Sequence, residues 1–194
     1  MHVHIWMFCG YAGSGKTAAA NILHSHLDPH TTYTIAFADA VKDDVASLYN
    51  LPRTLFDTQE GKASIVKTPD GECTARELLI EYSLAMKQAQ GYDVWAKKVA
   101  HNIHNKVEKC KIKNVIIHDW RFIAEIDTIT CEFPQPEFIL HRIRIERPSV
   151  SCSLGIHIPS EHEIDTYTTE ITLTNEGTID DLNKKICKLI QSIM

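Results

Sequence analysis

The chain has 194 residues, of which 44% are hydrophobic and 23% charged, so its composition is globular and excludes a wholly disordered chain. The 20 Lys and Arg residues are outnumbered by 25 Asp and Glu, and the formal charge of −5 argues against a protein that coats a nucleic-acid polymer. The six cysteines form no C-x-x-C pair, and no apolar run is long enough to span a bilayer. We expect a single cytoplasmic domain over residues 1–194, with neither a membrane nor a nucleic-acid polymer as partner.

The first third of the chain alternates apolar strands with helices. Val3–Cys9 is a near-continuous apolar run typical of a buried parallel strand, and a glycine loop separates it from a helix over Lys16–His26. Thr32–Phe37 is β-branched and aromatic, which predicts a second strand, and a helix over Ala40–Tyr49 follows. The polar stretch Leu51–Asp70 predicts a loop with at most a short helix.

Two helix starts stand near the middle of the chain. Thr74 and Glu77 form a T-x-x-E capping box, which predicts a helix that Gly91 ends. Asp93 is expected to cap a second helix over Val94–Val107. Both helices carry apolar residues on one side, so both are expected to pack against a core.

The rest of the chain continues the alternation. In order we expect a strand over Asn114–His118, a helix over Phe122–Cys131, a strand over Glu137–Ile143, an open loop over Glu146–Pro159, a capping box over Ser160–Glu163, a strand over Ile171–Thr174 and a helix over Ile179–Ile193. Because uniformly apolar strands alternate with helices, the sequence predicts a three-layer α/β/α fold on a mainly parallel sheet.

Residues 10–17 read G-Y-A-G-S-G-K-T, the complete phosphate-binding loop pattern G-x-x-x-x-G-K-[ST]. Glycines let the backbone turn tightly, so that N–H groups converge on phosphate oxygens, and the helix that follows adds its N-terminal positive charge. Lys16 is expected to bridge the β- and γ-phosphates, and the Thr17 hydroxyl to hold Mg²⁺. The residues of this loop predicted to bind ATP are Gly10, Ala12, Gly13, Ser14, Gly15, Lys16, Thr17 and Ala18.

An aspartate and an arginine follow the apolar run at 114–118. A carboxylate at the C-terminal edge of a parallel strand faces the nucleotide crevice, so Asp119 is expected to order Mg²⁺ through water. Arg121 is placed to neutralise charge that builds during phosphoryl transfer. The alternative is a helix-capping aspartate and a surface arginine. No N-K-x-D guanine-reading sequence follows the loop, which favours a small-molecule kinase over a GTPase.

Arginines also gather near the strand predicted at 137–143. Arg142, Arg144 and Arg147 stand at spacings of two and three, and Pro, Ser and Gly residues follow them, which is typical of a closing lid over about residues 144–163. We predict that Arg144 binds the nucleotide and that Arg147 is catalytic, the alternative being an ordinary charged strand edge. Lys62 is expected to reach a substrate phosphate, unless it is a solvated loop lysine.

Five phrases together resemble the deoxynucleoside monophosphate kinase family of phages and large DNA viruses. They are F-A-D-A-V-K at 37–42, T-A-R-E-L-L at 74–79, Y-D-V-W at 92–95, D-W-R-F-I-A-E-I-D at 119–127 and N-E-G-T-I-D-D-L at 175–182. The phrases run in the family's order over essentially the whole chain. The resemblance implies a phosphate-loop kinase fold with a helical substrate-binding region over about residues 39–108 and a lid. It further implies transfer of the ATP γ-phosphoryl group, with Mg²⁺, to a deoxynucleoside monophosphate in the cytoplasm (of the host, for a viral protein).

The resemblance also assigns roles to individual residues. Lys42, Arg76 and Arg121 would meet the acceptor phosphate or the transferring group, and Asp39 would lie at the acceptor edge. The adenine of ATP would be lined by Asn175, Gly177 and Thr178. Proteins of the resembled family often form homodimers, so a homodimer is compatible with this interpretation.

The chain also departs from the family pattern. The Gly-Thr that often follows R-E-L-L, and the arginine soon after it, are replaced by I-E-Y-S at 80–83, with Lys87 as a cationic substitute. An aromatic residue such as Trp95 is expected to contact the acceptor nucleoside. Two alternatives stay open: a phosphomevalonate-kinase-like enzyme, which shares a similar layout, and a non-catalytic nucleotide-dependent switch. The switch would be expected to lack Lys16, Thr17 or Asp119, and all three are present.

Overall fold

The computed structural model of the chain describes residues 2–69, 71–150 and 163–194. Within these residues the main sheet has five strands in the order β2-β5-β1-β6-β7, and every neighbouring pair is parallel. The central strand β1 spans Val3–Cys9, as predicted. The others are β2 (Thr32–Ile35), β5 (Asn114–Ile117), β6 (Phe138–Glu146) and β7 (Ile171–Thr174).

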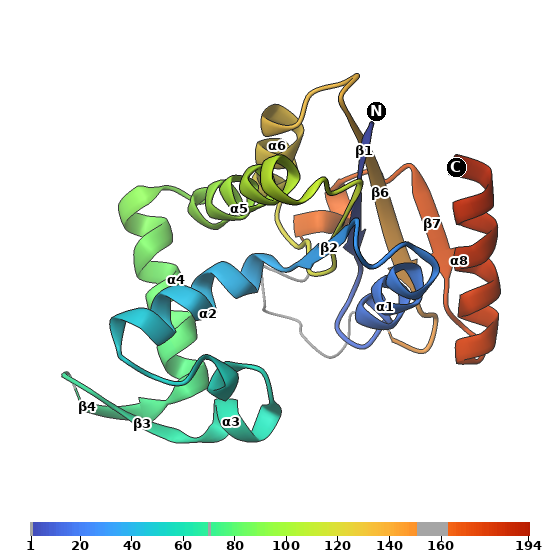
Figure 1. Cartoon of the computed structure of the whole chain (residues 1–194). Coiled ribbons are helices and arrows are strands. Elements are labelled where there is room, and N and C mark those ends of the chain that lie inside the picture. Colours follow the sequence, from blue (N-terminus) through green and yellow to red (C-terminus); the bar gives the residue numbers. More distant parts are fainter. Residues whose placement is uncertain (1, 70, 151–162) are drawn as a thin grey trace.

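Helices cover both faces of this sheet, which confirms the predicted three-layer α/β fold. Helices α1 (Lys16–His26) and α8 (Ile179–Ile193) pack on one face, and α5 (Val94–Cys110) and α6 (Ile123–Glu132) lie on the other (Figure 1). In the described part of the chain, no helix has the length and apolarity needed to cross a membrane.

The central strand explains why its sequence is apolar throughout. Its side chains alternate between two buried clusters: Ile5 and Met7 belong to the cluster beneath α5 and α6, while Trp6 and Phe8 belong to the cluster beneath α1 and α8. All four side chains are fully buried. A strand with a helical layer on each face has no solvent-facing side, so polar alternation would bury unpaired groups.

A helical region projects from the sheet between β2 and β5, on the left of Figure 1. It holds α2 (Phe37–Leu48), the 3₁₀ turn η1 (Arg53–Phe56), α3 (Gln59–Ala63), β3 (Ile65–Thr68), β4 (Gly71–Thr74) and α4 (Ala75–Gln90). The loop predicted over residues 51–70 is therefore wrong in part, because β3 pairs antiparallel with β4. Each of these strands has only four residues, and only Val66 is buried, so no alternating apolar pattern marks them.

Capping residues fix both ends of α4 as predicted. The Thr74 hydroxyl accepts the backbone N–H of Glu77, whose carboxylate accepts the N–H of Thr74 in return. Gly91 ends the helix with φ of 103°, a left-handed value that glycine adopts without strain. Asp93 behaves differently from the prediction: it makes no side-chain cap, and its carboxylate pairs with Lys97 at 2.7 Å instead.

Three other boundaries differ from the sequence prediction. Helix α2 begins at Phe37, inside the segment predicted as strand, because the carboxylate of Asp119, two residues after the end of β5, caps it there. Strand β6 runs on to Glu146 because β7 pairs with its second half, up to Thr174. Of the predicted capping box at 160–163, residues 160–162 lie outside the described residues, as does most of the lid predicted at 144–163. Glu163 begins the 3₁₀ turn η3 (Glu163–Thr166).

Candidate active site

The loop between β1 and α1 has a backbone that only glycine can form at two positions. Gly10 has φ of 135°, and a Cβ there would lie 2.2 Å from the carbonyl oxygen of Ile145. Gly15 has φ of 104°, and a Cβ there would lie 2.4 Å from Nδ2 of Asn175. Neighbouring strands thus approach this loop too closely for any side chain, which holds its N–H groups in a fixed concave arrangement.

Polar groups in the same loop suit a bound phosphate. The Lys16 ammonium donates to the carbonyl oxygens of Gly10 and Tyr11, at 2.6 and 2.7 Å, so it lies folded over the loop that precedes it. Ser14 is buried, and its Oγ has no hydrogen-bond partner among the described residues. Thr17 is exposed at the start of α1. A fixed cradle, a nearby cation and an unpaired buried hydroxyl together fit the phosphates of a nucleotide.

Asn175 joins the end of β7 to the phosphate loop. Its side-chain Nδ2 donates to the backbone oxygen of Ser14 at 2.8 Å, and its own backbone N–H donates to Glu146 at 2.6 Å. The adjoining residues shape the turn into α8, since the Thr178 hydroxyl accepts the N–H of Asp181. A contact of Asn175, Gly177 and Thr178 with adenine stays a prediction. The structure shows that the side chain of Asn175 holds the backbone of the loop through a hydrogen bond.

Asp119 caps the start of α2. One carboxylate oxygen accepts the N–H of Phe37 at 2.7 Å, and the other accepts the N–H of Ala38 at 3.0 Å. Burial raises the pKa of this carboxyl, and those two N–H groups oppose the rise. The capping alternative raised from the sequence is thus present, although the capped helix is α2 rather than the one that follows. The role of Asp119 toward Mg²⁺ stays a prediction.

A second carboxylate fixes the backbone at Arg121. Oε2 of Glu125 accepts the N–H groups of Arg121 and Phe122, at 2.8 and 3.0 Å, while the Arg121 residue itself is exposed. The next N–H, of Ile123, donates to Glu163 at 2.7 Å. Burial, with Asp119 nearby, raises the pKa of Glu125 to about 8. The carboxylates of Glu125 and Glu163 therefore fix the backbone conformation of the segment that carries Arg121.

Four of the cations predicted to meet the acceptor lie near one another. Burial lowers the pKa of Lys62, and the charges of Lys42, Arg76 and Arg121 lower it further, against the opposing charge of Asp57. Charges that depress a neighbour's pKa lie in its vicinity, because charge effects between exposed groups fade over a Debye length of about 10 Å. The sequence alone does not show this cluster, since its members come from α2, α3, α4 and the segment after β5.

An ion-pair network holds one side of this cation cluster. Asp39 binds Lys42 at 3.3 Å and Arg53 at 2.9 Å, and Asp57 binds the same two cations at 3.2 and 2.6 Å. Arg53 also pairs with Asp43 at 2.5 Å. Sequence reasoning did not select Arg53, although its spacing of four from Asp57 was a visible signal. Asp39 and Lys42 are therefore oriented by partners before any substrate arrives.

The arginines of β6 separate in the structure. Arg144 lies beside the phosphate loop: it pairs with Asp165, and its guanidinium carbon is 5.7 Å from the centre of the Tyr11 ring. Tyr11 donates to the same aspartate at 2.6 Å. Arg142 instead binds Glu170 at 2.5 Å. Arg147 is exposed, and the predicted lid beyond it lies mostly outside the described residues.

Trp95 occupies the core beside α4. Only 3% of the residue is exposed, and its ring centre lies 6.0 Å from that of Tyr82. The structure thus places Trp95, at the start of α5, in the buried core next to Tyr82 of α4. Direct contact between Trp95 and an acceptor stays a prediction.

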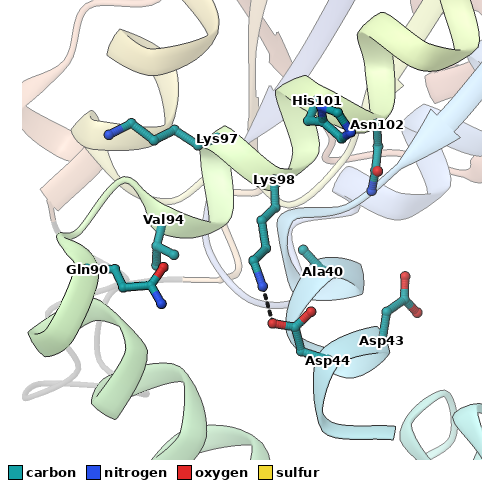
Figure 2. A pocket seen from close by; sticks show the side chains of 9 residues that line it. All are labelled: Ala40, Asp43, Asp44, Gln90, Val94, Lys97, Lys98, His101 and Asn102. Carbon is teal, nitrogen blue, oxygen red and sulfur yellow. Dashed lines mark hydrogen bonds and ion pairs between the residues drawn. The ribbon is translucent and has the colours of Figure 1, made fainter. Parts of the chain in front are cut away.

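A separate hollow lies between α2 and α5. It has a volume of about 660 Å³ and contains none of the predicted site residues. Figure 2 shows Lys98 and Asp44 paired across it. No group of three or more His, Cys, Asp or Glu side chains in the described part of the chain is arranged to hold a metal ion.

Comparison with known proteins identifies the fold. No protein-family model matches the chain, and no curated protein matches its sequence. Among solved structures, an APS kinase from Mycobacterium tuberculosis superposes with a TM-score of 0.50 at 11% identity, over 98% of this chain and 97% of that one. A sugar kinase from a Janibacter species gives 0.49 at 12% identity, over 98% and 95%. A shikimate kinase from Aquifex aeolicus gives 0.46 at 13% identity, over 98% and 97%.

The similarity to the APS kinase, together with the sheet order, defines the class of fold. The chain has the three-layer α/β fold of P-loop kinases, with the phosphate loop between its central strand and first helix. The sequence identities are low, so what the chain shares with these kinases is the fold. Its acceptor has to be inferred from its own residues.

Proposed function

We propose that this chain transfers the γ-phosphoryl group of ATP to a deoxynucleoside monophosphate, giving a deoxynucleoside diphosphate and ADP. The observation that carries the proposal is the cation cluster of Lys42, Lys62, Arg76 and Arg121, which lies apart from the phosphate loop. An enzyme that binds one nucleotide at its phosphate loop needs a second anion site only if its acceptor is itself anionic. Four clustered cations suit the dianionic phosphate of a monophosphate acceptor.

The nucleotide-binding side of the reaction rests on the phosphate loop. The backbone N–H groups of residues 10–15 would hold the phosphates of ATP, and Lys16 would leave its two carbonyl partners to follow the γ-phosphoryl group. The exposed Thr17 hydroxyl fits the role of Mg²⁺ ligand, and the metal would neutralise charge on the phosphates. Asn175 keeps the loop in shape throughout.

The acceptor side rests on preorganised cations. Lys42 is held by Asp39 and Asp57, and the backbone at Arg121 is held by Glu125. Positioning and electrostatic stabilisation account for nearly all catalysis of phosphoryl transfer, since little covalent chemistry is left for the protein. Arg121 would stabilise the charge that develops as the phosphoryl group moves between the two substrates.

A direct assay tests this function. Purified chain, ATP and Mg²⁺ are incubated with each of dAMP, dCMP, dGMP and dTMP, and products are separated by anion-exchange chromatography. The proposal expects ADP and a matching deoxynucleoside diphosphate in equal amounts from at least one acceptor. Turnover of phosphomevalonate with none of these four would support the phosphomevalonate-kinase-like alternative. ATP binding without any turnover would support the nucleotide-dependent switch.

A further inference from the structure

Helix α4 carries two large aliphatic side chains that remain exposed. Ile80 is 60% exposed and Leu84 is 51% exposed, while Ala75 and Leu78 of the same helix are buried. Its packed side is defined by Leu78, which is buried, and by Tyr82, whose hydroxyl donates to Asp44 of α2 at 3.3 Å. Ile80 therefore lies on a side of α4 that none of these contacts occupies.

The side of α4 that includes Ile80 also carries two cations. Arg76, Ile80, Ser83 and Lys87 follow one another at intervals of four, three and four, so they form one stripe along the helix. The stripe is about 16 Å long at 1.5 Å per residue. It is long enough to lie along both the phosphate and the nucleoside of one acceptor.

Both ends of the stripe are fixed to walls of the candidate site. Arg76 donates to Gln59 of α3 at 2.6 Å, close to the cation cluster around Lys62. The Lys87 ammonium lies 3.8 Å from the centre of the Phe122 ring, next along the chain from Arg121. The stripe thus runs along α4 from its contact with α3 to its contact with the Arg121 segment, and Ile80 and Ser83 lie between these two contacts.

We propose that Ile80 and Ser83 form the surface that contacts the nucleoside part of the acceptor, while Arg76 holds its phosphate end. This inference rests on the proposed function. The exposed aliphatic face of Ile80 suits the flat apolar face of a heterocyclic base, and the Ser83 hydroxyl offers one hydrogen bond to the edge of that base. A base that stacks on Ile80 would cover a side chain otherwise left in water.

Steady-state kinetics of Ile80→Ala and Ser83→Ala test the assignment. Ile80→Ala is expected to raise KM for the preferred deoxynucleoside monophosphate about tenfold, the scale for losing part of an apolar contact, with KM for ATP unchanged. Ser83→Ala is expected to change the ratio of kcat/KM among the four acceptors. Leu48→Ala on α2 removes a comparably exposed side chain (63%) and should leave all constants unchanged. Thermal melting confirms that each variant is folded.

The outcomes separate this inference from the function on which it rests. Acceptor constants unchanged in both α4 variants, with Lys62→Ala raising the acceptor KM in the same assay, would overturn the α4 assignment and leave the function standing. A wild-type chain that phosphorylates none of the four acceptors would overturn both. A higher acceptor KM in Ile80→Ala, without a matching change in Leu48→Ala, would support the assignment.

Discussion

The side-chain amide of Asn175 donates a 2.8 Å hydrogen bond to the backbone oxygen of Ser14, 161 residues earlier in the chain. This bond joins the end of β7 to the middle of the phosphate loop. The same amide lies where a Cβ on Gly15 would fall, so one residue both supports the loop and requires glycine next to Ser14. The conformation of the loop therefore depends on Asn175 at the end of β7 as well as on the glycines of the loop itself.

Asn175→Ala is expected to lower the free energy of unfolding by about 1–3 kcal/mol, because the buried carbonyl of Ser14 loses its partner. It should also weaken ATP binding, since the loop loses its support from behind. Urea unfolding and titration with a non-hydrolysable ATP analogue measure the two effects. Asn21→Ala, at an exposed asparagine on α1, is the control. An Asn175→Ala protein with wild-type stability and ATP affinity would contradict this role.

Lys16→Ala is expected to reduce kcat by a factor of at least about 100 while leaving the melting temperature close to that of the wild type. The ammonium donates to the carbonyl oxygens of Gly10 and Tyr11 rather than packing into the hydrophobic core, so its charge serves the phosphate loop. Turnover and thermal melting are measured on the same preparation. Activity near that of the wild type would show that the loop does not hold the transferring phosphate.

Lys62→Ala is expected to raise KM for the acceptor by a factor of about 10 to 100, with a much smaller effect on KM for ATP. The lysine is half-buried near three other cations, so an acceptor phosphate bound beside it would offset their mutual repulsion. Lys67→Ala is the matched control, because that lysine lies in the same region with 86% of its side chain exposed. Equal effects of the two substitutions on acceptor KM would refute a specific role for Lys62.

Asp119→Ala is expected to lower the free energy of unfolding by about 1–3 kcal/mol, because the N–H groups of Phe37 and Ala38 lose their acceptors at the start of α2. Asp127→Ala, at an exposed position on α6, should change stability by less than about 0.5 kcal/mol. Urea denaturation compares the two variants with the wild type. If Asp119→Ala unfolds at the wild-type midpoint, the carboxylate does not act as a cap.

A pair of histidines on the neighbouring strands β1 and β6 predicts that the stability of the protein falls in acid. Nδ1 of His4 and Nε2 of His141 are 2.9 Å apart, and burial, helped by His4, lowers the pKa of His141 from 6.5 to about 4. The unfolded chain therefore takes up this proton near pH 6.5 and the folded chain only near pH 4. Stability from this pair is present above pH 6.5 and is lost as the pH falls toward 4.

His141→Phe measures that contribution, because it keeps an aromatic ring next to Trp6 and removes the titrating group. Between pH 7 and pH 5, the wild type should lose on the order of 1–2 kcal/mol more unfolding free energy than the variant does. Denaturant titrations at the two pH values give both differences. Parallel losses in the two proteins would mean that His141 titrates normally in the folded state.

Local patterns were sufficient to predict most of the fold. The apolar run of β1, the capping box at Thr74 and Glu77, and the glycine after α4 each act within a few residues, so the sequence displays them directly. The hairpin of β3 and β4 was missed because its strands are short and largely exposed. The start of α2 was misplaced because its cap, Asp119, lies after β5, 82 residues further along the chain.

Part of the candidate site was predictable from local patterns in the same way. The phosphate loop is contiguous, and its pattern alone identifies its chemistry. The cation cluster depends on how α2, α3 and α4 fold over one another, and only the structure shows that Lys62 lies among the other three cations. Arg53 orients Asp39 from 14 residues away, a contact that the sequence does not display.

The fate of the γ-phosphoryl group tests the central claim most directly. A ³¹P NMR time course of the chain with ATP, Mg²⁺ and an equimolar mixture of the four deoxynucleoside monophosphates follows every phosphate at once. The account predicts that the γ-phosphorus signal of ATP declines while the monophosphate signal of at least one acceptor gives way to the paired signals of a deoxynucleoside diphosphate. An ATP signal that stays constant, or that is replaced by inorganic phosphate with all acceptors unchanged, would contradict it.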